Sequence, residues 1–244
     1  TSKFGLDSEA VNKISDEARE NKLVNITSIA CHIGSQISDE NLILKSLDVI
    51  SEIANNLSAN GHAIKFLDIG GGLGIQYKDE EEGDPKILMA GVKNKLEGKE
   101  YKIILEPGRS IVGSAGILVT RIEYIKNAGG KKFAIIDAGM NDLIRPSLYE
   151  AWHEVKELEN REISSDTYDL AGPVCETGDI LAKDRNLKIL PNDFVAFMDV
   201  GAYGSVMSSN YNSRLKPMEL LVRGGEIEVI RRKETFEDLI ALES

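Results

Sequence analysis

The sequence has few cysteines, no excess of positive charge and no long apolar run. Cys31 and Cys175 are its only cysteines, which is too few for a disulfide framework and fits a reducing compartment such as the cytoplasm. No apolar stretch reaches membrane-spanning length. The 29 basic residues are outnumbered by 40 acidic ones and form no dense basic patch. We therefore expect small-molecule or protein partners, and no nucleic acid, membrane or metal.

Internal repeats, low-complexity tracts and flexible linkers are also missing. The 244 residues are 42% hydrophobic and 28% charged, which is enough to bury one large core or two ordinary ones. No signal peptide is visible, but the abrupt start at residues 1–5 leads us to expect an absent upstream segment.

Residues 1–111 alternate between helical and strand-like patterns. Apolar residues recur at helical spacing over residues 8–21, 39–60 and 84–98. Short apolar runs lie between them, at residues 26–31, 64–69 and 101–105. Such an alternation predicts parallel strands covered by helices, and three strands cannot close an eight-stranded barrel. We interpret this half as the back end of a larger α/β domain.

Residues 112–244 read differently. Strand-like runs at residues 117–124, 132–137, 194–200 and 218–222 are separated by turn-rich segments, including the glycine pairs 129–130 and 224–225. This pattern predicts a mainly antiparallel β domain, of sandwich or Greek-key type, that joins the first domain directly near residue 112. A short helix is expected over residues 235–242.

The most informative segment is residues 103–109, an apolar strand that ends in Glu106-Pro107-Gly108-Arg109. Glu106 is suited to pair with a cationic heterocycle nitrogen, while Arg109 and the backbone N–H groups of the turn are suited to hold a phosphate. Pyridoxal phosphate combines these two features. Taken alone, however, the segment is explained better by an ion pair between Glu106 and Arg109.

Two further strand ends carry ligand-binding residue types. His32 and Ser35 follow the first strand, and a glycine run at residues 70–74 follows the second. Glycines let backbone N–H groups approach an anion, although a dinucleotide fold and a purely structural turn are alternatives. The dinucleotide motif fits less well because Ile75 occupies the place of its last glycine. The carboxyl ends of parallel strands face one site, so we expect the three loops to act together.

Six segments together resemble the diaminopimelate decarboxylase family, which has the alanine-racemase-like pyridoxal-phosphate fold. They are residues 32–36, 70–74, 106–109, 137–146, 175–176 and 201–204. The resemblance runs through the chain and covers about the C-terminal three-fifths of such an enzyme. It implies the end of a cofactor-binding (β/α)8 TIM barrel, residues 1–111, followed by the β domain, residues 112–244. It also implies a carboxy-lyase that converts meso-diaminopimelate to L-lysine, the last step of lysine biosynthesis.

The resemblance implies roles for particular residues. Glu106 would pair with the pyridine nitrogen of pyridoxal phosphate, and His32 would stack on the ring. The phosphate would be surrounded by Ser35, Gly71, Gly72, Pro107, Gly108, Arg109 and Tyr203.

For the substrate, the same resemblance implies binding by Arg109, Arg145, Tyr149, Glu176 and Tyr203. Arg145 would bind the distal carboxylate with help from Tyr149, Glu176 would meet the distal ammonium group, and Cys175 would return a proton. Without the resemblance, Arg145 reads as a solvated charge, Tyr149 as a half-buried core residue and Cys175 as a small packed hydrophobe.

One family feature is missing from these 244 residues. The family attaches its cofactor to a lysine in a motif resembling Tyr-Ala-Xaa-Lys-Ala-Asn, which does not occur here. We therefore expect a fragment that is inactive and poorly soluble alone. The family also implies a homodimer in which the Cys175-Glu176 loop enters the partner's active site.

Two other functions remain open. A decarboxylase of ornithine, arginine or carboxynorspermidine would share the cofactor residues but should lack an arginine for a distal carboxylate. A non-catalytic binding homologue should lose Cys175 or the phosphate residues, which are present here.

Overall fold

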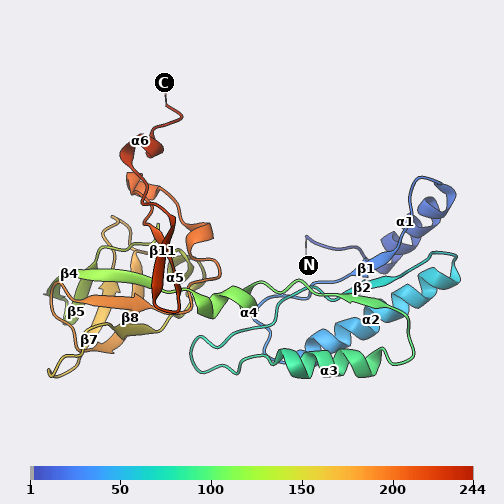
Figure 1. Ribbon diagram of the computed structural model, residues 1–244, viewed down its shortest axis with the longest axis horizontal. Coiled ribbons are helices and arrows are strands. Elements are labelled where there is room, and N and C mark those ends of the chain that lie inside the picture. The colour runs from blue at the N-terminus through green and yellow to red at the C-terminus, as the bar shows by residue number, and fades with distance from the viewer. Residues whose placement is uncertain (1–2, 244) are drawn as a thin grey trace. The chain divides into compact units, whose positions relative to one another are not determined.

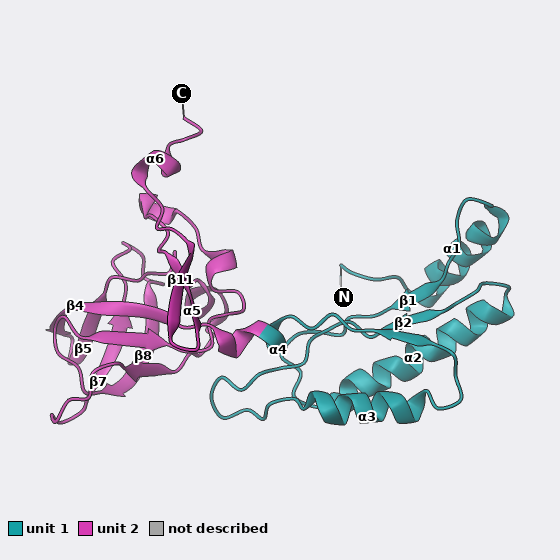
Figure 2. Cartoon of the chain, viewed as in Figure 1, with its two compact units in different colours: residues 1–111 teal, residues 112–244 magenta. Residues whose placement is uncertain are grey.

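A computed structural model describes residues 3–243 of the chain and divides it into two compact units, residues 1–111 and 112–244 (Figure 2). Each unit has a hydrophobic core of its own. Within the described residues, no helix has both the length and the apolar character needed to cross a membrane.

Unit 1 is built on three parallel strands, β1 (Ser28–Ala30), β2 (Phe66–Asp68) and β3 (Lys102–Ile104), in the order β1-β2-β3. Leu67 in the central strand pairs with Ile29 on one side and Ile103 on the other. The helices are α1 (Ser8–Glu20), α2 (Glu40–Ala59), α3 (Pro85–Lys95) and the short α4 (Arg109–Val112). The predicted alternation of helix and parallel strand is confirmed (Figure 1).

The three long helices of unit 1 begin where their sequences provide a capping aspartate. Asp7, Asp39 and Asp84 each accept a hydrogen bond from a backbone N–H of the first turn. Pro85 then occupies the start of α3, where its missing N–H costs nothing. These caps explain why the helix starts were predictable to within a residue.

The core of unit 1 lies between the sheet and helices α2 and α3. Leu47 and Leu57 of α2 are buried with Leu67 of β2 and Leu88 of α3. Gly91 lets α3 approach α2 closely, because a Cβ there would lie under 3.0 Å from the side chain of Leu44. Helices α2 and α3 therefore cover the sheet that β1, β2 and β3 form.

Unit 2 contains a six-stranded sheet in the order β6-β9-β4-β5-β7-β8. Its strands are β4 (Leu118–Ala128), β5 (Lys131–Ile136), β6 (Val155–Glu157), β7 (Asp166–Ala171), β8 (Ile180–Leu187) and β9 (Phe194–Phe197). Neighbouring strands are antiparallel except β5 and β7, which are parallel. The core holds the fully buried Ile122, Ile136, Leu170 and Phe197. The expected fold class, α/β followed by mainly antiparallel β structure, is confirmed.

The six-stranded sheet curls until its two edge strands meet. The backbone N–H of Lys188, just after β8, donates to the carboxylate of Glu157 in β6 at 2.8 Å. Arg185 of β8 donates to the backbone carbonyl of His153, two residues before β6, at 3.1 Å. The sheet is therefore nearly a closed barrel.

Smaller elements complete unit 2. They are η1 (Gly113–Ala115), α5 (Arg145–Tyr149), η2 (Ser205–Met207), η3 (Tyr211–Ser213), the hairpin of β10 (Glu219–Arg223) and β11 (Glu226–Arg231), and α6 (Phe236–Leu239). The hairpin turns at Gly224 and Gly225, both with positive φ, as the sequence predicted. The predicted terminal helix is present but shorter, beginning after its N-cap Thr235.

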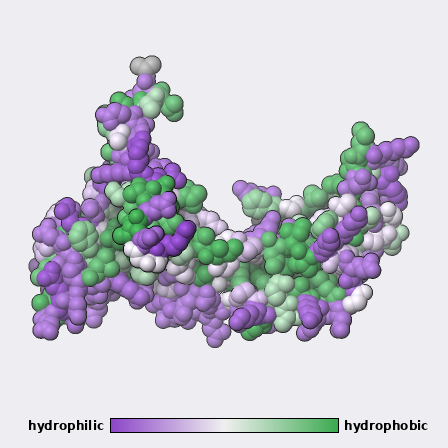
Figure 3. All heavy atoms as spheres, viewed as in Figure 1, coloured by the Kyte–Doolittle hydropathy of each residue, from purple (hydrophilic) through white to green (hydrophobic). Residues whose placement is uncertain are grey.

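Apolar side chains remain exposed on both units (Figure 3). In unit 1 the end of β3 exposes 39% of Ile104 and of Leu105. In unit 2 the β10–β11 hairpin exposes Leu220, Val222, Ile227 and Val229.

Candidate cofactor and substrate site

Three loops of unit 1 follow the carboxyl ends of β1, β2 and β3 and are joined by backbone hydrogen bonds. The N–H of Cys31 donates to Asp68 at 2.9 Å, and the N–H of Ile69 donates to Ile104 at 3.2 Å. The N–H of Glu106 then donates to the carbonyl of Gly70 at 2.8 Å. The three predicted ligand-binding loops therefore lie side by side at one end of the sheet.

The glycines at residues 70–72 make this close packing possible. A Cβ on Gly70, Gly71 or Gly72 would lie under 3.0 Å from the backbone of a neighbouring loop: the carbonyls of Cys31, Glu106 and Gly34 respectively. Gly70 and Gly72 also have positive φ, which favours glycine. The structure thus gives the glycines a packing role, and their contact with a phosphate stays a prediction.

Arg109 is held beside Ser35 by a residue that the sequence did not reveal. Its guanidinium donates to the Tyr77 hydroxyl at 2.5 Å and to the Ser35 hydroxyl at 3.3 Å, and it also lies 5.6 Å from the Tyr77 ring centre. Tyr77 is buried, and its backbone N–H donates to Glu80 at 3.0 Å. Tyr77 follows the glycine run by three residues, which is the only sequence signal that points to it.

The remaining predicted residues of unit 1 surround this pair. His32 is exposed, and its Nδ1 lies 3.4 Å from the backbone N–H of Gly71. Glu106 is exposed at the end of β3, and Gly108 has open space where a side chain would lie. Pro107 lines an apolar pocket of about 270 Å³ behind the Gly70-Gly71 turn.

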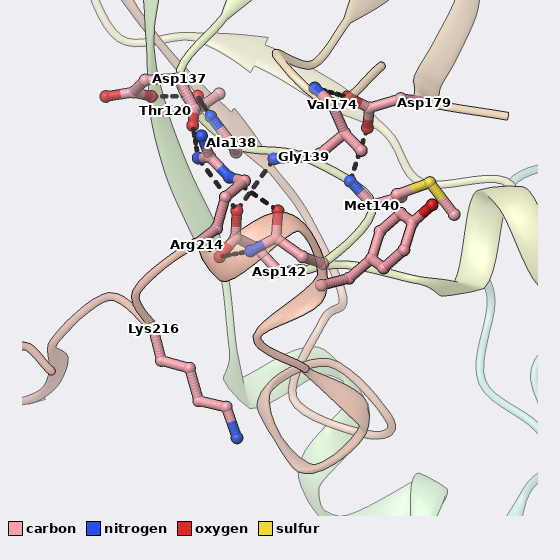
Figure 4. A network of polar contacts seen from close by, with 12 residues as sticks. Thr120, Asp137, Ala138, Gly139, Met140, Asp142, Val174, Asp179, Arg214 and Lys216 are labelled. Carbon is pink, nitrogen blue, oxygen red and sulfur yellow. Dashed lines mark hydrogen bonds and ion pairs between the residues drawn. The ribbon is translucent and has the colours of Figure 1, made fainter. Parts of the chain in front are cut away.

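In unit 2, Asp179 joins the loop that precedes α5 to the loop that carries Cys175 and Glu176 (Figure 4). One oxygen of its carboxylate accepts the backbone N–H of Met140 at 2.6 Å, and the other accepts that of Val174 at 2.6 Å. Met140 belongs to the loop that leads to Arg145, and Val174 precedes Cys175. A single buried carboxylate therefore fixes the spacing of the two loops.

A second buried aspartate stabilises the first of these loops from within. The carboxylate of Asp142 accepts the backbone N–H of Gly139 at 2.9 Å and the side-chain amide of Asn141 at 3.0 Å. Arg214 donates to Asn141 at 2.9 Å and to the carbonyl of Asp137 at 2.5 Å (Figure 4). Burial raises the pKa of both Asp142 and Asp179 above the usual value of an aspartate.

Arg145 is buried, which contradicts its reading as a solvated charge. Only 7% of the residue is exposed, and its guanidinium lies 2.9 Å from Nε2 of His153. Tyr149, at the other end of α5, is 61% exposed rather than half-buried. The hydroxyl of Ser147, between them, donates to the carbonyl of Gly178 at 2.5 Å, so α5 is tied to the Cys175-Glu176 loop.

Cys175 is an exposed free thiol, which overturns its reading as a packed hydrophobe. Its neighbour Glu176 accepts a hydrogen bond from the hydroxyl of Tyr211, a residue absent from the predicted set. This bond raises the pKa of Tyr211. The loop therefore presents a thiol and an oriented carboxylate side by side.

Tyr203 lies outside these two loops, on the turn before η2. It is 42% exposed and has a φ of 61°, an unusual conformation for a residue with a large side chain. Most of the residues predicted to bind the cofactor therefore lie in unit 1, and most of those predicted to bind the substrate lie in unit 2. Further residues contact these or support their loops in the structure, namely Tyr77, Asp142, His153, Asp179, Tyr211 and Arg214.

The chain matches, over residues 11–201, the family described as "Pyridoxal-dependent decarboxylase, C-terminal sheet domain", and it belongs to this family. The resemblance inferred from its motifs is thereby confirmed.

Two similar curated proteins are diaminopimelate decarboxylases. The chain is 43% identical to diaminopimelate decarboxylase of Pseudomonas aeruginosa and 44% identical to that of Aquifex aeolicus, over 99% and 98% of its residues. It covers 58% and 57% of those two proteins. The crystal structure of Helicobacter pylori diaminopimelate decarboxylase complexed with L-lysine superimposes with a TM-score of 0.93 at 42% identity, covering 99% of this chain and 60% of that one. The chain therefore spans somewhat under two thirds of the length of these relatives.

Proposed function

We propose that the protein containing this chain is a pyridoxal-phosphate-dependent carboxy-lyase that converts meso-diaminopimelate to L-lysine, the last step of lysine biosynthesis. Residues 1–111 would be the final strands and helices of the cofactor-binding barrel, and residues 112–244 the β domain that follows it. Identity above 40% to curated diaminopimelate decarboxylases, over nearly the whole chain, supports this proposal.

The residues of unit 1 fit the cofactor. A hydroxyl and a guanidinium are donors that suit a phosphate. At the strand ends the Ser35 hydroxyl oxygen lies 3.3 Å from a guanidinium nitrogen of Arg109. Glu106 leaves the neighbouring strand with its carboxylate exposed, as pairing with a pyridine nitrogen requires. We assign the phosphate to Ser35, Gly71, Gly72, Gly108 and Arg109 with Pro107 and Tyr203 beside it, the ring face to His32 and the ring nitrogen to Glu106.

Pyridoxal phosphate, when bound, supplies an electron sink for the electron pair left behind as CO₂ departs. Glu106 favours that chemistry by keeping a proton on the ring nitrogen, since a carboxylate stabilises the cationic form. Cys175 then delivers its thiol proton to the carbon that lost the carboxylate. Its exposure suits this role, because a buried thiol would not reach a substrate.

The observation that carries the substrate assignment is the buried Arg145. A guanidinium keeps its charge even when buried, and a buried cation discriminates strongly in favour of a carboxylate. Arg145 lies on α5, which Ser147 ties to the loop that carries Glu176. A cation and an anion on linked elements suit the distal carboxylate and ammonium groups of diaminopimelate, with Tyr149, Arg109 and Tyr203 as further contacts.

The alternative substrates fit this arrangement less well. Ornithine, arginine and carboxynorspermidine offer no distal amino-acid head to occupy both Arg145 and Glu176. A non-catalytic homologue would not need an exposed Cys175 beside an oriented Glu176. We therefore rank diaminopimelate first.

We further propose that the protein is a cytoplasmic homodimer in which the Cys175-Glu176 loop of one subunit completes the site of its partner. The cofactor-linking lysine would belong to the part of the relatives' length that this chain does not cover. For that reason, functional experiments require the full-length protein.

The decisive experiment measures CO₂ release by the full-length protein with pyridoxal phosphate. Meso-diaminopimelate is offered in parallel with lysine, ornithine, arginine and carboxynorspermidine. We expect strong preference for meso-diaminopimelate. Preference for another substrate would overturn the assignment of Arg145 and Glu176, and no release from any of them would favour a binding homologue.

A further inference from the structure

The end of α5 brings His153 back beside Arg145, eight residues earlier in the chain. Glu150 has a φ of 52° and a ψ of 29°, the left-handed conformation that ends a helix and reverses the chain. The N–H of Ala151 then donates to the carbonyl of Arg145 at 3.3 Å. The reversal places the His153 ring against the Arg145 guanidinium.

The hydrogen bonds of His153 define the state of its ring. Its Nδ1 lies 2.8 Å from the carbonyl of Met198, which can only accept, so Nδ1 carries the proton. Its Nε2 lies 2.9 Å from a nitrogen of Arg145, which can only donate, so Nε2 carries none. His153 is fully buried and is therefore held as the neutral Nδ1–H tautomer.

The backbone around His153 is fixed on two sides, by β9 and by the edge strand β8. On one side the N–H of Met198 donates to the carbonyl of Glu154 at 2.9 Å, and Val155 pairs with Phe197 in β9. On the other side Arg185 of β8 donates to the carbonyl of His153 at 3.1 Å, and its guanidinium lies 3.0 Å from the centre of the Trp152 ring. The imidazole is thus a rigid support.

We propose that His153 is a positioning residue for substrate selection: its neutral ring orients the Arg145 guanidinium toward the distal carboxylate of the substrate without neutralising its charge. A carboxylate at this place would hold Arg145 equally well but would cancel the charge that recognises the substrate. An apolar side chain would leave the charge but not its direction. The inference rests on the proposed function, because it assumes that Arg145 binds this carboxylate.

Three substitutions in the full-length protein separate orientation, charge and packing. His153→Gln keeps a neutral acceptor, His153→Leu removes the acceptor, and His153→Glu replaces it with an anion. We expect KM for meso-diaminopimelate to rise about tenfold or more in His153→Leu and further in His153→Glu, and to stay nearest the unaltered value in His153→Gln. In all three, kcat and cofactor affinity should change little.

The binding of two amines, measured as inhibition constants, also tests whether His153 acts through recognition of the distal carboxylate. L-Lysine retains a carboxylate, whereas 1,5-diaminopentane has none. The inhibition constant for L-lysine should rise in parallel with KM in His153→Leu and His153→Glu, while that for 1,5-diaminopentane should stay unchanged. A similar loss for both amines would mean that His153 acts only through folding, and would overturn the inference.

A double-mutant cycle distinguishes failure of this inference from failure of the proposed function. If Arg145→Ala leaves KM unchanged, the substrate assignment itself is wrong. If Arg145→Ala raises KM and His153→Leu raises it equally in the presence and absence of Arg145, the two residues act independently and the inference is wrong. We expect His153→Leu to have no further effect on KM once Arg145 is alanine.

A control and a spectroscopic measurement complete the design. His62 also makes a side-chain hydrogen bond, to Ser15 at 2.8 Å, but in unit 1, and His62→Leu should leave KM for meso-diaminopimelate unchanged. Nitrogen-15 spectra of histidine-labelled protein, assigned with His153→Gln, should show the Nδ1–H tautomer for His153. An Nε2–H tautomer or an imidazolium would contradict the proposal.

Discussion

Asp179 binds two loops through its two carboxylate oxygens, and it does so from a buried position. Burial raises its pKa above 3.8, so the folded state holds the proton more tightly than the unfolded chain does. The protonated Asp179 side chain therefore adds to the free energy of unfolding. This contribution is fully present below the pKa that Asp179 has in the unfolded chain, and it is lost as pH rises through its pKa in the folded protein.

An Asp179→Asn variant tests the direction in which Asp179 changes stability with pH. Asparagine does not titrate, so the free energy of unfolding of the variant, relative to the unaltered protein, should rise as pH rises above about 4. Denaturant unfolding of both full-length proteins at a series of pH values measures the difference. A relative stability that falls with rising pH would mean that Asp179 is held as a favourable charge instead.

Arg145 provides the second prediction at this scale. Arg145→Ala should raise KM for meso-diaminopimelate by a factor of about a hundred, because a charged hydrogen bond to the distal carboxylate is lost, with little change in cofactor affinity. Steady-state kinetics and a cofactor titration measure the two effects separately. Equal loss of substrate and cofactor affinity would contradict its assignment to the substrate.

The burial of Arg145 and the involvement of Tyr77 were beyond prediction because both depend on contacts between distant or reversed segments. His153 reaches Arg145 because Glu150 reverses the chain after α5. Tyr77 contacts Arg109 across 32 residues of sequence. The motif residues themselves lie at strand ends and in turns, where local sequence identifies them directly.

At the level of elements, the glycine turn after β2 determines how closely three loops approach. In a Gly71→Ala variant the added Cβ would lie under 3.0 Å from the carbonyl of Glu106. We expect a loss of about 1–3 kcal/mol in the free energy of unfolding and weaker cofactor binding, because the loop carrying Glu106 and Arg109 must move away.

Gly178→Ala is the matched control for that variant. The nearest atom to its Cβ, on Ser147, would be 3.7 Å away, an ordinary contact. Thermal unfolding and cofactor titration of both full-length variants make the comparison. Equal, small effects at the two positions would show that the loops of unit 1 tolerate separation.

Elements with local signals were predicted well, and those that depend on long-range pairing were not. The helices of unit 1 have capping aspartates and apolar faces, so their bounds followed from sequence. β6 is only three residues long and β8 contains Asp184 and Arg185, so neither has a strand-like apolar pattern. Both are strands because they pair with β9 and β7 respectively.

At the level of the whole molecule, the proposed dimer predicts complementation between damaged subunits. A Cys175→Ala chain supplies intact cofactor residues, and an Arg109→Ala chain supplies an intact Cys175-Glu176 loop. Co-expressed with different tags and purified through both, the mixed dimer should regain part of the activity that each homodimer lacks. With one of its two sites intact, about half is the expected upper limit.

The control is a mixed dimer of two Cys175→Ala chains purified in the same way, which should stay inactive. Activity no higher in the Cys175/Arg109 mixture than in this control would count against a site shared between subunits. The exchange of subunits can be followed independently by the recovery of both tags.

Asp142, Asp179 and Arg214 support the loops of unit 2 by binding backbone groups or other loop residues. The residues proposed to recognise the substrate are others: Arg145, Tyr149 and Glu176. The residues that support the loops therefore differ from those proposed to recognise the substrate. A directed library can vary Arg145, Tyr149 and Glu176 while Asp142, Asp179 and Arg214 are kept. Under the proposed function, this separation of roles would allow the recognised distal group to be changed without disturbing the loops.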